Sequence, residues 1–130
     1  MDPNAGKKEL INRFGREELE ARLHAEDFKR ITLSFYKYII IDDAQELRDR
    51  LFKEWTELNC LGRIYIAREG INAQMNVPAH NWEKFVTHLY SLKEFKDVPF
   101  KLAVEDDSKS FLNLTVTVRE KIVADGLNAN

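Results

Sequence analysis

The side chains with the clearest capacity for chemistry in this 130-residue chain are three histidines and one cysteine. Cys60 is the single cysteine, so neither an internal disulfide nor a cysteine zinc cage can form. No basic neighbour activates Cys60 in the sequence, and we expect a small buried hydrophobe instead of a nucleophile. His24, His80 and His88 are scattered without partners at metal-ligand spacing, which predicts solvated imidazoles and no metal site.

Aromatic side chains alternate with polar ones along the apolar runs, which is the composition of a surface on which bases can stack. Three tyrosines and six polar residues are predicted to share one sheet face: Tyr36, Tyr38, Tyr65, Ser34, Asn72, Gln74, Asn76, Thr115 and Thr117. The segment from 71 to 77 has no aromatic residue, so an RNA-recognition motif is disfavoured. The alternative is that the tyrosines pack under N-terminal helices or a neighbouring domain.

Basic side chains gather at two places and predict a positive rim able to hold phosphates. Arg63 and Arg68 flank the second predicted strand, and Lys109, Arg119 and Lys121 flank the last. The whole chain has 20 Lys plus Arg against 22 Asp plus Glu, a net charge of -2, so no bulk basic field attracts nucleic acid. Surface charges balanced by Glu69, Asp106 and Asp107 are the alternative explanation of this rim.

The loop after the first predicted strand bears on phosphate hydrolysis. An acyl-phosphate hydrolase needs backbone N–H groups and a positive side chain there to hold the phosphate. The segment Ile41-Asp42-Asp43-Ala44 offers two carboxylates and no glycine, and it would repel a phosphate. The sequence therefore argues against this reaction.

The elements that position these residues follow from periodicity and turn signals. Strand-like alternation predicts a strand over 31–41, and a helical stripe then runs from an Asp42/Asp43 cap to about 58. Strands over 63–67 and 71–77 follow, joined by a Glu69-Gly70 turn. A helix from Trp82 to Leu89, a short edge strand over 101–104 and a last strand over 111–119 complete the order. Gly62 is expected to end the first helix. This order predicts an α+β, ferredoxin-like (acylphosphatase-like) βαββαβ sandwich with a four-stranded antiparallel layer and both helices on one face.

Length and composition predict one compact domain, because 44% of the residues are hydrophobic and 32% are charged. Residues 1–30 are predicted to form a helical extension, 31–127 the ferredoxin-like domain and 128–130 a tail. The sequence contains neither a membrane span nor a signal-peptide pattern, which predicts a cytoplasmic location without a membrane partner.

Three segments of this chain resemble one known family. They are Leu33-Ser34-Phe35-Tyr36-Lys37-Tyr38, then Ala67-Arg68-Glu69-Gly70-Ile71-Asn72-Ala73-Gln74, then Lys109-Ser110-Phe111 with Val118 to Leu127. Together they resemble the N-terminal domain of the bacterial rhodanese-related tRNA uridine hydroxylases, over about residues 10–127. The resemblance implies an oxygen-dependent enzyme that forms 5-hydroxyuridine at the wobble position and carries its catalytic cysteine in a following rhodanese domain.

No segment here resembles the rhodanese active-site loop, so the resemblance implies a module that is not catalytic alone and leaves open whether this chain is itself an enzyme. The family-motif positions are Tyr36, Lys37, Glu69, Gly70, Asn72, Ser110 and Phe111, and the candidate RNA-binding positions are Lys109, Arg119, Lys121, Arg63 and Arg68. We expect Gly70 to need a positive φ and Glu69 to pair with Arg68, Lys109 or Arg119.

The expected partners are tRNA and the rhodanese domain of the same protein, and the sequence identifies no cofactor. The alternative function is a scaffold that docks the rhodanese domain without touching RNA. A small-ligand or acyl-phosphate site would require converging N–H donors, which the acidic first loop disfavours.

Overall fold

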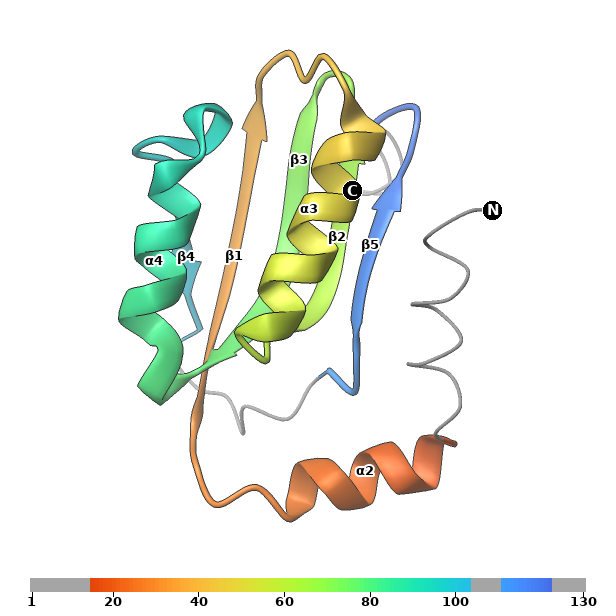
Figure 1. Ribbon diagram of the computed structural model, residues 1–130, viewed down its shortest axis with the longest axis vertical. Helices are drawn as coiled ribbons and strands as arrows, with labels where there is room; N and C mark the ends of the chain where they lie inside the picture. Colours follow the sequence, from red (N-terminus) through yellow and green to blue (C-terminus); the bar gives the residue numbers. More distant parts are fainter. Residues whose placement is uncertain (1–14, 104–110, 123–130) are drawn as a thin grey trace.

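The computed structural model describes residues 15–103 and 111–122 (Figure 1). Lys109 and Ser110 of the sequence motifs lie outside the described residues. So do Leu10, Ile11 and Phe14, which are apolar residues of the predicted helical extension. The described elements are α2 (Arg16–His24), β1 (Arg30–Tyr38), α3 (Ala44–Glu57), β2 (Leu61–Ala67), β3 (Gly70–Pro78), η1 (Ala79–Asn81), α4 (Trp82–Ser91), η2 (Lys93–Phe95), β4 (Lys101–Leu102) and β5 (Leu114–Val118).

One five-stranded sheet organises the molecule, with the strand order β4-β1-β3-β2-β5. The segments β1, α3, β2, β3, α4 and β4 make the βαββαβ unit, so the ferredoxin-like fold class is confirmed. The expectation of a four-stranded antiparallel layer was wrong. The edge of β1 is taken by the short β4, and β5 instead pairs in parallel with β2 as a fifth strand at the opposite edge.

Helices α3 and α4 cover one face of the sheet (Figure 1). The core between the two layers is built from side chains without solvent exposure, among them Trp55, Phe85, Ile64 and Met75. Helix α3 begins as the sequence predicts, because an Asp43 side-chain oxygen accepts the backbone N–H of Glu46 at 3.0 Å. The apolar stripe and this cap together dock α3 on the sheet.

The end of α3 differs from the expectation. Asn59, with φ of 61°, supplies the left-handed residue that ends the helix, and Gly62 lies inside β2. Gly62 has a φ of +145°, and a Cβ there would lie 2.4 Å from the Gln74 carbonyl oxygen. Gly62 is therefore required for the close approach of β2 to β3 rather than for ending a helix.

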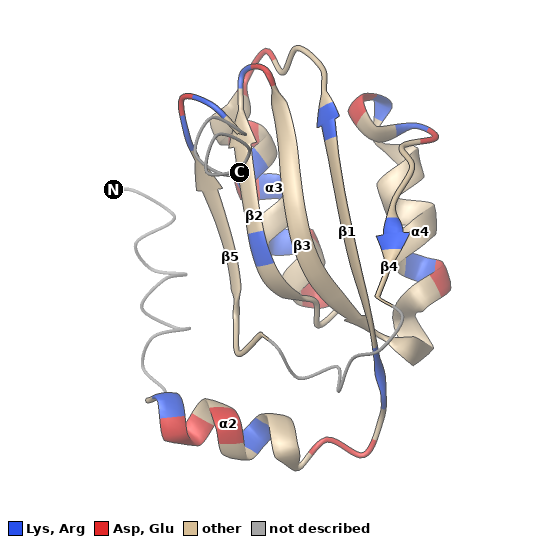
Figure 2. Ribbon diagram, turned by 180° about the vertical axis from the view of Figure 1, so that it is seen from behind, with Lys and Arg blue, Asp and Glu red and all other residues tan. Residues whose placement is uncertain are grey.

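Helix α2 lies beyond one end of the sheet and not over its uncovered face (Figures 1 and 2). Its Leu23 is buried, and the chain then returns through Glu26 to Arg30 at the start of β1. The Arg30 guanidinium is buried and donates to both carboxylate oxygens of Glu26 at 2.9 and 2.7 Å, to the Asn59 carbonyl and to Asn76 Oδ1. These contacts fix the region that joins α2 to the sheet. Within the described residues, no helix is long and apolar enough to cross a membrane.

Candidate functional site

The sheet face opposite α3 and α4 is the one turned toward the viewer in Figure 2. The strand register places two transverse rows of side chains on it. Cross-strand partners share a face, so the strand register defines these rows. One row contains Tyr36, Asn72, Tyr65 and Thr117; the other contains Lys101, Ser34, Gln74, Arg63 and Thr115. We refer to these nine residues as the open face. Eight of the nine lie in β1, β2, β3 and β5, whose positions in the sequence the alternation pattern predicts. The ninth, Lys101, lies in the short edge strand β4.

The tyrosines of β1 are exposed on the open face. Tyr36 is 54% exposed, and Tyr38, the next residue of β1 on this side, is 57% exposed. Their rings meet edge to face with centroids 6.2 Å apart. The alternative that these two tyrosines pack under the N-terminal helices does not hold for the described α2, which lies beyond the end of the sheet (Figure 2).

Two arginines in this region lie against aromatic rings. The Arg119 guanidinium carbon lies 4.0 Å from the centroid of the Tyr65 ring, and the Arg63 carbon lies 5.6 Å from the centroid of Phe111. Such contacts hold the positive charge in place while leaving guanidinium N–H groups directed elsewhere. Tyr65 therefore differs from Tyr36 and Tyr38, because an arginine already occupies a face of its ring.

The strands contain basic residues but no acidic ones. Every charged residue inside the five strands is basic: Arg30, Lys37, Arg63 and Lys101. The described Asp and Glu residues all lie in helices, turns and loops, as the colours of Figure 2 show. Of these four, Arg63 and Lys101 lie on the open face. Arg30 is buried and paired with Glu26, and Lys37 lies beside the core residue Ile71 on the other face. Arg63 and Lys101 make the open face a small positive surface on a chain of net charge -2.

The predicted rim is divided between the two ends of the sheet. Because β2 and β5 run parallel, residues near their starts lie at one end and residues beyond their last positions lie at the other. Arg63 lies beside Phe111 toward the starts, whereas Arg68, Arg119 and Lys121 follow the strand ends. The structure thus presents two basic groups, and Lys109 lies outside the described residues.

Five family-motif residues, Tyr36, Lys37, Glu69, Gly70 and Asn72, lie at the end of the sheet where β3 begins, whereas Phe111 lies toward the other end. Gly70 has a φ of +152°, and a Cβ there would lie 2.0 Å from the Lys37 carbonyl oxygen, so only glycine fits. A carboxylate oxygen of Glu69 accepts the backbone N–H of Ile122 at 3.2 Å, and Asn72 Nδ2 donates to the Ile122 carbonyl at 3.4 Å. These contacts anchor the segment that follows β5.

The expected ion pairs of Glu69 with Arg68 and Arg119 were wrong. Among the described residues, the carboxylates found in ion pairs do not include Glu69. Its hydrogen bond to the Ile122 backbone instead assigns Glu69 a structural role. The sequence pattern gives no signal for this contact, since 53 positions separate the two residues.

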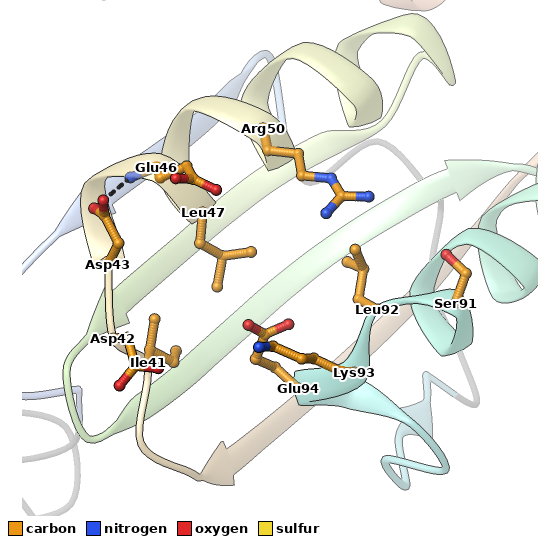
Figure 3. A pocket seen from close by; sticks show the side chains of 10 residues that line it. All are labelled: Ile41, Asp42, Asp43, Glu46, Leu47, Arg50, Ser91, Leu92, Lys93 and Glu94. Atoms are coloured by element: carbon orange, nitrogen blue, oxygen red, sulfur yellow. Dashed lines mark hydrogen bonds between the residues drawn. The ribbon is translucent and has the colours of Figure 1, made fainter.

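A hollow of about 500 Å³ lies where an acylphosphatase-like fold would hold a phosphate, between the start of α3 and η2 (Figure 3). Four carboxylates, those of Asp42, Asp43, Glu46 and Glu94, and two basic side chains, Arg50 and Lys93, line it. The Asp43 carboxylate already accepts the Glu46 N–H (Figure 3). The helix N-terminus is thus occupied by the protein's own anion, which supports the argument against phosphate hydrolysis.

His88 contradicts the expectation of solvated imidazoles. The Trp55 indole N–H donates to His88 Nδ1 at 3.0 Å, and His88 Nε2 contacts a Glu54 carboxylate oxygen. Since Nδ1 accepts, Nε2 carries the proton that Glu54 accepts. Burial raises the pKa of Glu54, but the hydrogen bond from His88 and the charge of Arg50 outweigh it and hold that pKa below its ordinary value. His24 and His80 are exposed, as expected.

Cys60 is a buried structural residue. It is 2% exposed, as the sequence predicts, and burial raises the pKa of its thiol to about 12 despite the nearby charge of Arg30. A thiol with this pKa stays protonated at neutral pH and is a poor nucleophile. The described residues contain no group of three or more His, Cys, Asp or Glu side chains able to hold a metal ion.

Comparison with known proteins gives one family. Residues 30–122 match the family described as "UPF0176 acylphosphatase like domain". A tRNA uridine(34) hydroxylase of Leptospira interrogans is 58% identical over 122 residues, which are 94% of this chain and 33% of that protein. The tRNA uridine(34) hydroxylase of Yersinia enterocolitica is 48% identical over 120 residues, 92% of this chain and 34% of that protein.

The chain thus spans about a third of the length of the curated relatives it matches. Among solved structures, the dark state of BlrB, a BLUF protein, superposes with a TM-score of 0.54 over 78% of this chain and 81% of that one. The two sequences are 6% identical, so this likeness concerns the fold alone. The sequence match, the βαββαβ sheet and the named relatives lead to one conclusion: this chain belongs to the UPF0176 acylphosphatase-like domain family, the N-terminal part of tRNA uridine(34) hydroxylases.

Proposed function

We propose that this chain is the RNA-contacting part of a tRNA wobble-uridine hydroxylase and that it is not catalytic by itself. The single observation that carries the proposal is the acid-free open face, which lies on a chain whose relatives are named for a reaction on tRNA. Basic side chains attract the phosphates of any nucleic acid, and positioned ones fix its orientation. A cytoplasmic location is part of this proposal, because tRNA is the expected substrate.

In this proposal residues 1–30 form a helical extension, 31–127 the RNA-contacting domain, and 128–130 lead toward a rhodanese domain. The basic groups at the two ends of the open face, Arg63 on one side and Arg68, Arg119 and Lys121 on the other, hold two stretches of the tRNA backbone. Lys109 belongs to the same proposed set. Reaction chemistry is supplied by the remaining two thirds of the full-length enzyme.

Binding of unmodified tRNA at several salt concentrations tests this function. We expect binding that weakens as salt rises, and Arg63→Ala or Arg119→Ala should each weaken it and reduce the salt slope by about one. Lys53→Ala, at an exposed position of α3 on the other side of the molecule, is the matched control and should change neither quantity. Absence of salt-dependent tRNA binding would refute the proposal.

A second candidate function is a scaffold that docks the rhodanese domain without touching RNA. The observation in its favour is the exposed apolar stripe along β1 and just beyond it, where Ile40 is 73% exposed beside Tyr38 and Tyr36. In this case a separately produced rhodanese domain would protect the tyrosines from solvent, whereas tRNA would have no effect. Titration of one labelled sample with each partner separates the two functions.

A further inference from the structure

We propose that the open face binds unpaired nucleotides, with two successive bases stacked on Tyr36 and Tyr38 and the flanking phosphates held by Lys101 and Arg63. This inference rests on the proposed function, since it names the part of an RNA that the face accepts. Base stacking on aromatic side chains is the general way in which proteins hold single-stranded nucleic acid.

The two tyrosine rings are available for such a ligand. Both side chains are more than half exposed, and among the described residues neither hydroxyl group has a hydrogen-bond partner. Large aromatic side chains more often bury their surface or bind a partner. Tyr65 is excluded from this role, because the Arg119 guanidinium carbon lies 4.0 Å from its ring centroid.

The angle between the rings selects unpaired bases. The ring planes of Tyr36 and Tyr38 are nearly perpendicular, at 89°, with centroids 6.2 Å apart. Two bases that lie flat on these rings therefore have perpendicular planes. They are separated by the spacing of two strand residues, ~6.7 Å. Bases in a duplex stay stacked about 3.4 Å apart along each strand. Paired RNA cannot use both rings, whereas a loop or a single strand can.

The rest of the face favours RNA over a protein partner. Cross-strand pairing places Lys101 beside Ser34, two residues from Tyr36 along β1, and Arg63 beside Gln74. Around the tyrosines the open face offers amides, hydroxyls and positive charges, and its strands contain no carboxylate. The centres of stable protein interfaces are poor in charged residues. An anionic strand with exposed bases matches both the rings and the charges.

The test compares three RNA probes by fluorescence anisotropy with the full 130-residue chain. The probes are a hairpin with an unpaired loop, the same stem as a continuous duplex, and the loop sequence as a single strand. We expect the hairpin and the single strand to bind roughly tenfold or more tightly than the duplex. Equal binding of duplex and hairpin would overturn the inference, and salt-dependent binding of all three would leave the proposed function standing.

Variants assign the effect to the rings. Tyr36→Ala and Tyr38→Ala should each weaken hairpin binding by about tenfold and leave duplex binding unchanged, whereas Tyr36→Phe retains the ring and should retain the affinity. Leu102→Ala is the matched control, because Leu102 is 53% exposed but pairs with core residue Leu33 and so belongs to the opposite face. Denaturation curves verify that each variant is folded. Hairpin binding unaffected by both alanine variants would refute the inference, and absence of binding to any RNA would refute the proposed function itself.

Discussion

At the scale of single residues, polar groups inside the structure are held by partners that lie far away in the chain. Trp55, His88 and Glu54 illustrate this, because they join α3 to α4 through the buried indole N–H. Helical periodicity predicts the apolar neighbours Phe85 and Leu89 but assigns His88 to the polar side of α4. The contact of His88 with Trp55 was not predicted, since periodicity carries no information on contacts between helices.

Replacement of His88 by alanine should destabilise the chain by about 1–3 kcal/mol, because the indole N–H of Trp55, which has no solvent exposure, loses its acceptor. Urea denaturation followed by tryptophan fluorescence measures the change. His80→Ala is the control, since His80 is exposed, and it should shift the free energy of unfolding by less than about 0.5 kcal/mol. An equal effect of the two substitutions would contradict the assigned role of His88.

The lowered pKa of Glu54 makes one part of the stability depend on pH. A carboxyl group whose pKa is lower in the folded than in the unfolded state stabilises the fold above its ordinary value of 4.5, and this contribution disappears as pH falls through the folded-state pKa. Glu54→Gln should therefore be less stable than the unsubstituted chain at neutral pH, and the difference should shrink in acid. Urea titrations at a series of pH values measure it; a constant difference would contradict the shift.

At the scale of elements, the two edges of the sheet are protected in different ways. The carbonyl of Val116 in β5 accepts a hydrogen bond from Arg48 Nε of α3 at 2.7 Å, and the Arg48 guanidinium also lies over the Phe52 ring. At the other edge, β4 pairs with β1 at Leu33 and Ser34, and the Ala103 N–H just beyond β4 donates to the Thr32 carbonyl at 2.9 Å. The Arg48 side chain thus covers the edge at β5, and the two-residue strand β4 covers the edge at β1.

Arg48→Ala should lower the free energy of unfolding by about 1–2 kcal/mol, because the hydrogen bond to Val116 is lost. Lys53→Ala, at an exposed position on the same helix, should have little effect and serves as the control. Urea denaturation measures both, and light scattering reports any association through the uncovered strand edge. Equal stability of the two variants would show that the Arg48 contact contributes nothing measurable.

Gly70 and Gly15 differ in the space that each leaves for a side chain. Gly70→Ala should destabilise the fold by about 2 kcal/mol or more, because the new Cβ meets the Lys37 carbonyl and the φ of +152° disfavours any side chain. Gly15→Ala introduces a Cβ with nothing within 4 Å and should be close to neutral. Thermal denaturation compares the two. A stable Gly70→Ala variant would indicate that the turn can rearrange.

Much of the secondary structure was predictable because alternation and capping are local signals. The Asp43 cap, the helix stripes and the hairpin at Gly70 all follow from nearby residues, and the structure confirms them. The pairing of β5 with β2 was not predictable, since alternation defines a strand but not its neighbour. The same limit applies to the open face: the sequence predicts its tyrosines and the side on which Asn76 lies, but alternation does not reveal that Asn76 is buried and bound to Arg30.

At the scale of the whole molecule, Arg63 and Lys101 on the open face give a chain of net charge -2 and pI of about 5.9 one surface that attracts polyanions. We expect retention on heparin at pH 7, and an Arg63→Glu/Lys101→Glu double variant should elute at lower salt. Lys53→Glu/Lys84→Glu changes the net charge equally on exposed helical positions and should elute later than the first double variant. Identical elution of the two double variants would mean that only net charge matters.

The placement of β4 and β5 on opposite flanks affects how the sheet is completed during synthesis. Strands β1, β3 and β2 are translated before either flanking strand, so the emerging polypeptide holds a ribbon with both sides unpaired. At roughly 5–20 residues per second, the ribosome needs about one to three seconds to go from Leu102 to Val118. During that interval the side of β2 that later pairs with β5 is bare, and ribosome-associated chaperones have their opportunity to shield it.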